Sequence, residues 1–562
     1  QETSNKWSIG IDFGTTNSCV YYKENKENPK ELNFKNRINL PYEPGTDEEE
    51  IEEVMQAHKE FVPSRLVTIP FMTILRERAY KESTVENLPF RSNFIYYVDQ
   101  VLYAIQDLPD DKRPLKFNLK WDEAEQSRTK VQYFVSQAVL QSAVEAAANG
   151  VKRENLTFNF SYPEAYNTDH LRAFKRITRR AVNIGLHDEN YKTQEKTGFE
   201  TESIASALYF AKGQEVPFTE NVVTIDIGGG TSDLSIWQDT KLLWRNSFKL
   251  AGKDVLINYL TNNLTLIKEI SGNDDLLLES YQTLQSIKTN KAKLANGIEL
   301  LVNSPQFGEA FKKKFDIFSG KEKGKELKDL TELALSGILY YVSQVLNHLI
   351  ENGEFQSGAN KSKSLRICLG GKASTLYKVV FEDSEDQESL SKMVSKVTNG
   401  IFTNIGIVFT DTPKHEVSYG LLVDKTGATD LDLTDRSHET VLGEDVVVGK
   451  EKIGIVSKLD ADSQWRVKDI AQLKNFLKYL QAYSKIPVKL SKKFEGDLEG
   501  KINAELKNGQ ARALDLKKNM QSVEGDDSLA ELQKTSSIIE PVFIQGLKQV
   551  INEVTSGKLK FK

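Results

Sequence analysis

Alternating and helical patterns of apolar residues divide the first part of the chain into strands and helices in mixed order. Residues 7–13 and 19–22 are short apolar runs separated by a glycine turn, which predicts a β-hairpin. Residues 131–148 repeat apolar positions at intervals of three and four, which predicts an amphipathic helix. A strand at 156–161 and a helix at 168–182 follow. This alternation predicts an α/β fold.

The same alternation continues in the second part of the chain. A helix at 202–211 leads into an apolar strand at 222–227, and further strands are predicted at 234–237 and 242–247. A mostly helical stretch then runs to about residue 352. The remaining predicted elements are a long amphipathic helix (327–349), strands before Gly370 and at 405–409, and a helix at 416–423.

Two segments depart from this alternation. Residues 24–122 show an irregular pattern, which predicts an elaborated subdomain. The last residues, 424–562, combine two short strands with amphipathic and charged helices, which predicts a mostly helical C-terminal region. Its predicted strands are 446–448 and 453–456, and its predicted helices are 470–483, 499–507 and 538–554. At 562 residues the chain is too long for one hydrophobic core, so two to four domains are expected.

Composition indicates the class of protein but does not identify a binding partner. Hydrophobic residues make up 39% and charged residues 27% of the chain, which is ordinary for a soluble globular protein. The densest basic tract, 172–180, reads as the solvated face of a helix, so no nucleic-acid partner is predicted. Cys19 and Cys368 are predicted to be buried free thiols, and six scattered histidines predict no His/Cys metal site. No membrane span or signal peptide is predicted, and a cytoplasmic location is expected.

Two near-identical turns carry the candidate chemistry. In residues 9–18 and again in 222–233, an apolar strand ends in a carboxylate, Asp12 or Asp226, and glycines and a hydroxyl follow. Such carboxylates suit a magnesium ion that keeps part of its water shell. Phosphates bind backbone N–H groups at close range, and glycine lets the main chain approach them. The residues expected to do so are Gly14, Thr15, Thr16, Gly228, Gly229, Gly230 and Thr231.

These turns belong to neither of the common phosphate-binding motifs. No lysine follows the glycines at P-loop spacing, and the spacing of a dinucleotide-binding turn is missing. One such turn alone would equally be a tight turn or bulge. Two of them, followed by a third glycine pair at Gly370 and Gly371, predict a nucleotide site.

The three turns resemble those of a known family. Residues 9–20 closely resemble the first phosphate loop of the 70-kDa heat-shock chaperones, whose superfamily also holds actin and the sugar kinases. Residues 226–236 resemble the second phosphate loop of that family, and 369–374 resemble its adenosine loop. Weaker similarities, in the same order as in the family, lie at Pro63 and Ser64, at 161–167 and at 202–207. The resemblance covers about residues 7–423.

The resemblance implies a two-lobed actin-like ATPase fold in which a ribonuclease-H-like core is duplicated. Lobe I would span residues 1–210 and lobe II residues 211–423, with residues 424–562 as a mostly helical appendage of unknown role. ATP or ADP with Mg²⁺ would bind at the base of the cleft between the lobes. Hydrolysis would be slow, and it would depend mainly on positioning and charge stabilisation.

The resemblance also assigns roles to individual residues. Asp12 and Asp226 would hold the water shell of Mg²⁺, and Glu202 would orient or polarise the attacking water, with Asp226 a rival for the base. Asp233 would support the second loop. Glu202 has an alternative interpretation as an ordinary acidic helix N-terminus. The further residues expected to contact nucleotide are Asn17, Lys291, Gly370, Gly371 and Ser374, and Lys116 and Lys120 are candidates for the lysine that reaches the γ phosphate.

The sequence departs from the family in two places. Lysines occupy 288–293, where the family offers glutamate and arginine to adenine, so Lys291 lies either over the nucleotide or on a solvated helix face. After residue 423 neither the family's linker nor the evenly spaced strands of its peptide-binding β-sandwich is found.

The leading prediction is therefore an atypical heat-shock-type ATPase. Its nucleotide state would switch lobe closure and the binding of an unidentified protein partner or client. Alternatives are an actin-like filament or scaffold protein, a small-molecule kinase, and a binder that holds nucleotide without turnover.

Overall fold

The computed structural model describes most of the chain, and the gaps fall mainly at 36–68, 78–124, 425–464 and 521–539. The predicted subdomain at 24–122 is therefore described only in part, and Pro63, Ser64 and Asn167 lie outside the described residues. The described residues are 5–35, 69–77, 93–95, 101–106, 108, 115–121, 125–166, 168–188, 190–356, 363–381, 384–424, 440–448, 451–457, 465–520 and 540–561.

The amino-terminal part of the chain forms a six-stranded sheet around the predicted hairpin. The strand order is β3 (Lys30–Glu31), β2 (Asn17–Glu24), β1 (Trp7–Asp12), β8 (Leu156–Tyr162) and β9 (Thr197–Thr201), and β4 (Phe71–Met72) pairs with β2. β1 and β2 are antiparallel, which confirms the hairpin, and β8 and β9 continue the sheet in parallel.

A second sheet follows with the same plan. Its order is β12 (Lys241–Phe248), β11 (Ser232–Gln238), β10 (Asn221–Ile227), β13 (Ser364–Gly370) and β14 (Asn404–Phe409). In both sheets an antiparallel three-strand meander is extended by two parallel strands on the side of its first strand. Asp12 is therefore the last residue of β1, and Asp226 is the penultimate residue of the equivalent central strand, β10. The α/β class predicted from the sequence is correct.

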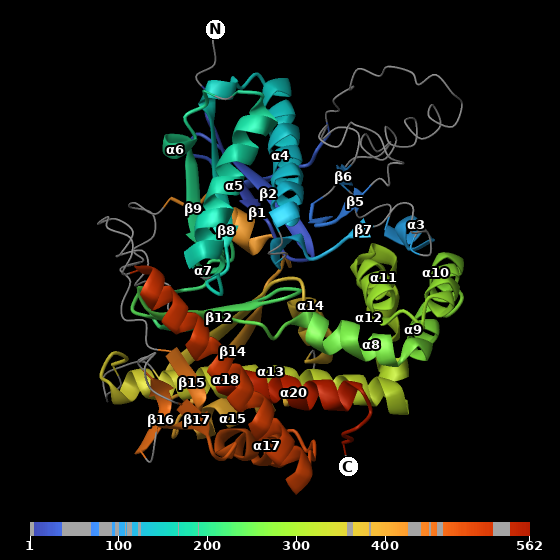
Figure 1. Cartoon of the computed structure of the whole chain (residues 1–562), viewed down its shortest axis with the longest axis vertical. Helices are drawn as coiled ribbons and strands as arrows, with labels where there is room; N and C mark the ends of the chain where they lie inside the picture. The colour runs from blue at the N-terminus through green and yellow to red at the C-terminus, as the bar shows by residue number, and fades with distance from the viewer. Residues whose placement is uncertain are drawn as a thin grey trace.

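Helices α4 (Glu125–Ala148) and α5 (Thr168–Leu186) lie side by side over one face of the first sheet (Figure 1). Their apolar residues, such as Phe134 and Phe174, pack against Phe13 and the buried residues of β1 and β8. Both helices were predicted at these places, although α4 begins six residues before the predicted start at 131. Short elements near this sheet are η3 (Arg153–Asn155) and α6 (Thr193–Lys196).

Two helices join the two sheets. α7 (Glu202–Lys212) packs on β10 and β11, and α16 (Glu416–Gly420) packs on β1, β2 and α7. A Cβ at Gly420 would overlap the backbone oxygen of Ala205, so these two helices cross at backbone contact. The predicted helix at 416–423 is thus shorter than expected.

Around residues 69–121 the described chain adds a small sheet of order β6 (Asn93–Ile95), β5 (Leu75–Glu77) and β7 (Leu115–Lys116), with α3 (Val101–Gln106) and the 3₁₀ turn η2 (Leu119–Trp121).

The predicted helical stretch follows β12 and contains α8 to α13 (Figure 1). Its members are the π-helical turn η4 (Lys253–Ile257), α8 (Asn258–Asn262), α9 (Leu264–Ser271), α10 (Asp275–Ser286), α11 (Lys291–Asn303), α12 (Pro305–Ser319) and α13 (Glu322–Glu351). Between the last strands lie α14 (Ser374–Val380) and α15 (Ser384–Val397).

Although the sequence predicts no membrane span, helix α13 is long and apolar enough to cross a membrane by length and composition. However, 83% of its most apolar window is buried inside the protein, because α13 forms the centre of the largest hydrophobic cluster. Its length and composition are also those of the core helix of a soluble protein, so they decide nothing about a membrane.

The C-terminal region gathers around α13 (Figure 1). It is less purely helical than predicted, because β15 (Thr440–Val448), β16 (Glu451–Ser457) and β17 (Trp465–Val467) form a three-stranded sheet. Its helices are α17 (Ala471–Tyr483), α18 (Lys492–Met520) and α20 (Val542–Thr555). Tyr340 stacks on Phe543, and the Tyr341 hydroxyl donates to the carbonyl of Val441 at 2.9 Å. The described C-terminal residues therefore share the core of the second sheet.

Candidate functional site

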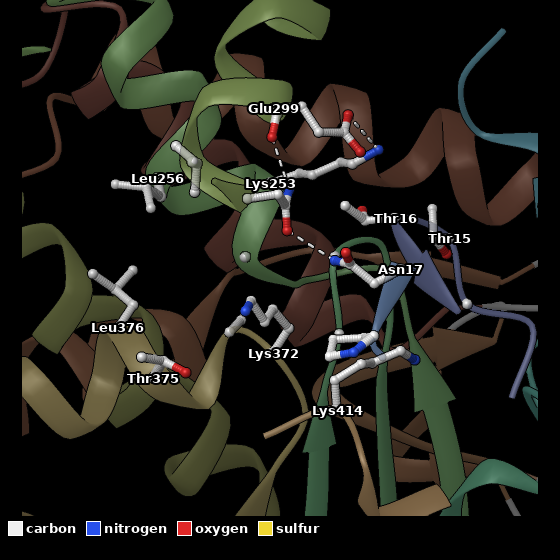
Figure 2. Close-up of a pocket in the computed structure, with 18 of the residues that line it drawn as sticks. Thr15, Thr16, Asn17, Lys253, Leu256, Glu299, Lys372, Thr375, Leu376 and Lys414 are labelled. Carbon is white, nitrogen blue, oxygen red and sulfur yellow. Dashed lines mark hydrogen bonds and ion pairs between the residues drawn. The ribbon is translucent and has the colours of Figure 1, made fainter. Parts of the chain in front are cut away.

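The three glycine turns of the sequence analysis converge on one cavity of about 420 Å³ (Figure 2). One wall comes from the turn between β1 and β2, a second from the turn between β10 and β11, and a third from the turn after β13. The predicted residues that line it are Gly14, Thr15, Thr16, Asn17, Glu202, Asp226, Gly228, Gly229, Thr231 and Asp233. Residues 222 to 233 and 9 to 18 thus lie together despite their distance along the chain.

The first two turns are in direct contact, and glycine makes that contact possible. A Cβ on Gly229 would overlap Oγ1 of Thr16, and a Cβ on Gly230 would lie 3.1 Å from Cγ2 of Thr15. Oγ1 of Thr16 is buried and has no hydrogen-bond partner among the described residues. Oγ1 of Thr15 accepts a bond of 2.9 Å from Nε1 of Trp121. The Thr16 hydroxyl thus lies buried against Gly229, at the contact between the two turns.

The third turn brings the backbone against the second carboxylate. Gly371 has φ +81°, a conformation that favours glycine, and a Cβ there would overlap Oδ1 of Asp226. Its N–H donates to Oε1 of Glu416 at 3.0 Å, and Oγ of Ser374 donates to its carbonyl at 2.7 Å. Gly370, Gly371 and Ser374 shape this turn from behind, whereas Lys372 and Thr375 line the cavity.

Asp12 is buried behind the first turn and is fully occupied by protein partners. Its Oδ1 accepts a hydrogen bond of 2.8 Å from Oγ of Ser161, and its Oδ2 is ion-paired with Nζ of Lys414. The Lys414 side chain is 12% exposed and lines the cavity. Burial alone lowers the pKa of Lys414, but Asp12, Asp226 and Glu202 outweigh burial and raise that pKa above its ordinary value.

Three further carboxylates are buried in this region, Asp226 and Glu416 near Lys414 and Asp233 near Lys120. Burial, and next the neighbouring Glu416, raise the pKa of Asp226 well above its usual range. Burial and Glu202 do the same to the pKa of Asp233, which faces Asp226 across the β10–β11 hairpin. Burial also raises the pKa of Glu416. These carboxylates repel one another in a poorly hydrated place, which favours a lysine partner such as Lys414 beside them.

Glu202 begins α7, as the sequence predicts, and is held by one of the two candidate lysines. Thr201 caps the helix, since its Oγ1 accepts from the N–H of Ile204 at 3.4 Å. Glu202 is ion-paired with Lys120, and both side chains are buried. Burial raises the pKa of Glu202, and Lys120 opposes that rise. Lys120 therefore lies at the cavity, whereas Lys116 lies on β7, partly exposed and away from the lining.

Lys291 does not line the cavity. It is exposed at the first turn of α11, with Nζ 3.4 Å from Oδ1 of Asn262. The other end of α11 reaches the cavity instead: Glu299 pairs with Lys253 at 2.9 Å, and Asn303 accepts a bond of 2.8 Å from Nδ2 of Asn17. Figure 2 shows Glu299, Lys253 and Asn17 along this side. Lys291 thus occupies a solvated helix face, the second of the two places expected for it, and the opposite end of the same helix lines the cavity.

The rest of the cavity wall is apolar. It is formed by Leu256, Ile257, Val302, Phe307, Phe311, Leu376 and Val379 from η4, α11, α12 and α14. A cavity with polar turns on one side and an apolar wall on the other suits a ligand that has a charged end and a flat apolar end.

Comparison with known proteins does not assign the chain to a family. No protein-family model matches the chain, and no curated protein matches it. The function must therefore be argued from the geometry of the cavity.

Proposed function

We propose that the chain binds ATP or ADP in this cavity and hydrolyses ATP slowly, as an atypical heat-shock-type protein with a two-lobed actin-like fold. The observation that carries the proposal is the meeting of three glycine turns from two sheets of identical connectivity. The phosphates lie against the turns, where glycines let the backbone N–H groups approach them and Thr15, Thr16 and Thr231 line the cavity. The base lies against the apolar wall formed by residues such as Leu256 and Phe311.

Glu202 is the residue proposed to act on the attacking water. It lies at the cavity on a rigid helix start, and Lys120 fixes its position. Burial raises its pKa, which brings a carboxylate closer to the pKa that proton transfer near neutral pH requires. Glu202 accepts a proton from water as the water attacks the terminal phosphate, and lysines at the cavity stabilise the charge on the phosphate oxygens. Asp226 is the rival base.

Of the ligands predicted from the sequence, Mg²⁺ fits these residues least well. Oδ2 of Asp12, one of the two predicted ligands, is already ion-paired with Lys414. Within the described part of the chain no group of three or more His, Cys, Asp or Glu residues could hold a metal ion. A water-mediated ion at Asp12 and Asp226 stays a prediction.

A ligand in the cavity would contact both sheets, which suits a nucleotide-dependent change between open and closed forms. The turns after β1 and β10 meet at Thr16 and Gly229, and Asn17 bonds Asn303. ATP would stabilise the closed form only if it bound that form more tightly. We propose that such closure controls an unidentified protein partner, since the described C-terminal residues pack on the second sheet.

Calorimetry with ATP and a phosphate-release assay test the proposal. Wild type is expected to bind ATP and release phosphate without an added acceptor. Glu202→Gln is expected to keep ATP affinity and to lose about a hundredfold in hydrolysis rate, the usual contribution of a positioned acid or base. Glu388→Gln, on the exposed face of α15, is the matched control and keeps both. Absence of ATP binding to wild type would refute the proposal, and unchanged hydrolysis in Glu202→Gln would refute the role of Glu202.

A further inference from the structure

We propose that Lys414 supplies, from the protein itself, the positive charge that a divalent cation brings to a nucleotide, so that nucleotide binding here does not require Mg²⁺. The inference rests on the proposed function and concerns the same cavity. It begins with a contact between distant parts of the chain: Nζ of Lys414 is ion-paired with Oδ2 of Asp12, at the end of the central strand of the first sheet. Lys414 also lines the cavity, beside the turn that follows Asp12 (Figure 2).

The ammonium group of Lys414 lies where the carboxylates of the two sheets meet. Besides its bond to Asp12, it interacts favourably with Asp226 and Glu202. A divalent ion that linked Asp12 and Asp226 to a phosphate would need the same region. Two cations within a few ångströms repel one another, and displacing Lys414 would leave an ammonium without its partner inside the protein. The charge needed between the carboxylates and a phosphate is therefore already present.

The surrounding backbone is built to hold this side chain. A Cβ on Gly14 would overlap the backbone oxygen of Asn17 and would lie 2.7 Å from Nζ of Lys414, so the first turn packs closely around the lysine. Lys414 itself has φ +78°, in the left-handed region that non-glycine residues seldom adopt. Such a conformation persists where surrounding contacts enforce it, and it clusters at functional sites. Glycine spacing and backbone conformation thus support the position of the ammonium independently of charge.

The lining offers several cationic side chains to an anionic ligand. Five lysines line the cavity, namely Lys120, Lys253, Lys312, Lys372 and Lys414. Four carboxylates line it, namely Glu202, Asp226, Asp233 and Glu299, and Asp12 pairs with Lys414 from behind the first turn. Positive charge is therefore present at the cavity without a bound metal ion.

The test measures ATP affinity by calorimetry in two buffers, one with excess EDTA and one with excess Mg²⁺. For wild type the two dissociation constants are expected to differ by less than about threefold. Lys414→Met removes the charge and keeps a similar volume. It is expected to weaken binding in EDTA at least about thirtyfold, and Mg²⁺ should restore part of the loss. Lys414→Arg keeps the charge and is expected to stay insensitive to Mg²⁺.

The matched control is Lys23→Met. Lys23 is also a buried lysine ion-paired with an aspartate, Asp424, at 2.8 Å, but it lies outside the cavity. Its variant is expected to bind ATP equally in both buffers, as wild type does. Circular dichroism checks that each variant is folded. If Lys414→Met does not fold, wild type and Lys414→Arg still decide the matter.

The possible results separate the two proposals. Wild type that binds ATP only with Mg²⁺ overturns the role of Lys414 and leaves the proposed function standing. Wild type that binds in neither buffer overturns the proposed function and the inference with it. A folded Lys414→Met that binds equally well in EDTA and in Mg²⁺ overturns the inference alone.

Discussion

At the scale of single residues, the cavity is defined by buried lysines paired with carboxylates. Lys120 pairs with Glu202 and Lys414 pairs with Asp12, and all four groups are removed from most solvent. The free energy needed to remove two charges from water offsets most of the free energy gained from their attraction, so such pairs contribute little to net stability. Loss of one partner is different, because it leaves an uncompensated charge. These pairs therefore fix the positions of side chains at the cavity and make single substitutions costly.

Lys120→Met tests that argument. It leaves the Glu202 carboxylate buried without its partner, and it should lower the free energy of unfolding by about 3–5 kcal/mol. Urea denaturation measures the loss. The double variant Lys120→Met/Glu202→Gln removes both charges and should recover much of the stability. Lys30→Met, which breaks the exposed pair with Glu27, is the control and should cost far less, because solvent screens an exposed ion pair. Equal losses for Lys120→Met and Lys30→Met would contradict the argument.

Glu332 of α13 gives a pH-dependent prediction outside the cavity. Burial, with Asp386 next, raises its pKa from 4.5 to about 7. Between these values the folded protein binds the proton and the unfolded chain does not. Stability due to Glu332 therefore falls as pH rises from 4.5 to 7, with a slope of at most about 1.4 kcal/mol per pH unit. The difference between the urea midpoints at pH 5.5 and pH 7.5 should be smaller in Glu332→Gln than in wild type. The exposed Glu388→Gln should leave the wild-type difference intact, and an unchanged difference in Glu332→Gln would contradict the assignment.

At the scale of elements, the glycine turns could be predicted because their signals are local. A strand, a carboxylate, glycines and a hydroxyl stand next to one another in residues 9–18 and 222–233, and both became hairpin turns at one cavity. Lys414 could not be predicted in this way, since it lies 402 residues from Asp12 and no local pattern marks it. The end of α11 that lies at the cavity could not be predicted either. Only tertiary packing decides that Asn303, rather than Lys291, reaches the cavity.

Gly371→Ala tests the third turn as an element. Any side chain at φ +81° is strained by about 1–2 kcal/mol, and here the added Cβ would also overlap the Asp226 carboxylate. We expect loss of ATP binding together with a larger stability loss than strain alone gives. Gly400→Ala is a matched control, because Gly400 has φ +73° and an added Cβ there meets nothing within 4 Å. Both variants are measured by calorimetry and urea denaturation. Retained ATP affinity in Gly371→Ala would show that this turn does not shape the site.

At the scale of the whole molecule, the C-terminal region is an integral part of the second half. The sequence predicted most of its helices but not its place, because amphipathic faces do not say what covers them. In the structure α20 packs on α13, and residues of both belong to the hydrophobic cluster that includes β10 and β13. Lys548 also pairs with Asp254 of η4 at 3.1 Å, close to the cavity-lining Lys253. A disturbance in α20 can therefore reach the elements that carry the turns.

Leu547→Ala measures this dependence. Leu547 is fully buried, and a Cβ on Gly337 would overlap it, so α13 and α20 are in close contact at this point. Removing the side chain should cost about 2–5 kcal/mol through lost burial and a residual cavity. Because the core is shared, amide hydrogen exchange should accelerate in β10 and α13 as well as in α17 and α20. Leu276→Ala, at a leucine that is 41% exposed on α10, is the control and should change exchange little. Faster exchange confined to residues 440–561 would mean that the C-terminal region unfolds independently. It could not then influence the cavity between the glycine turns through this core.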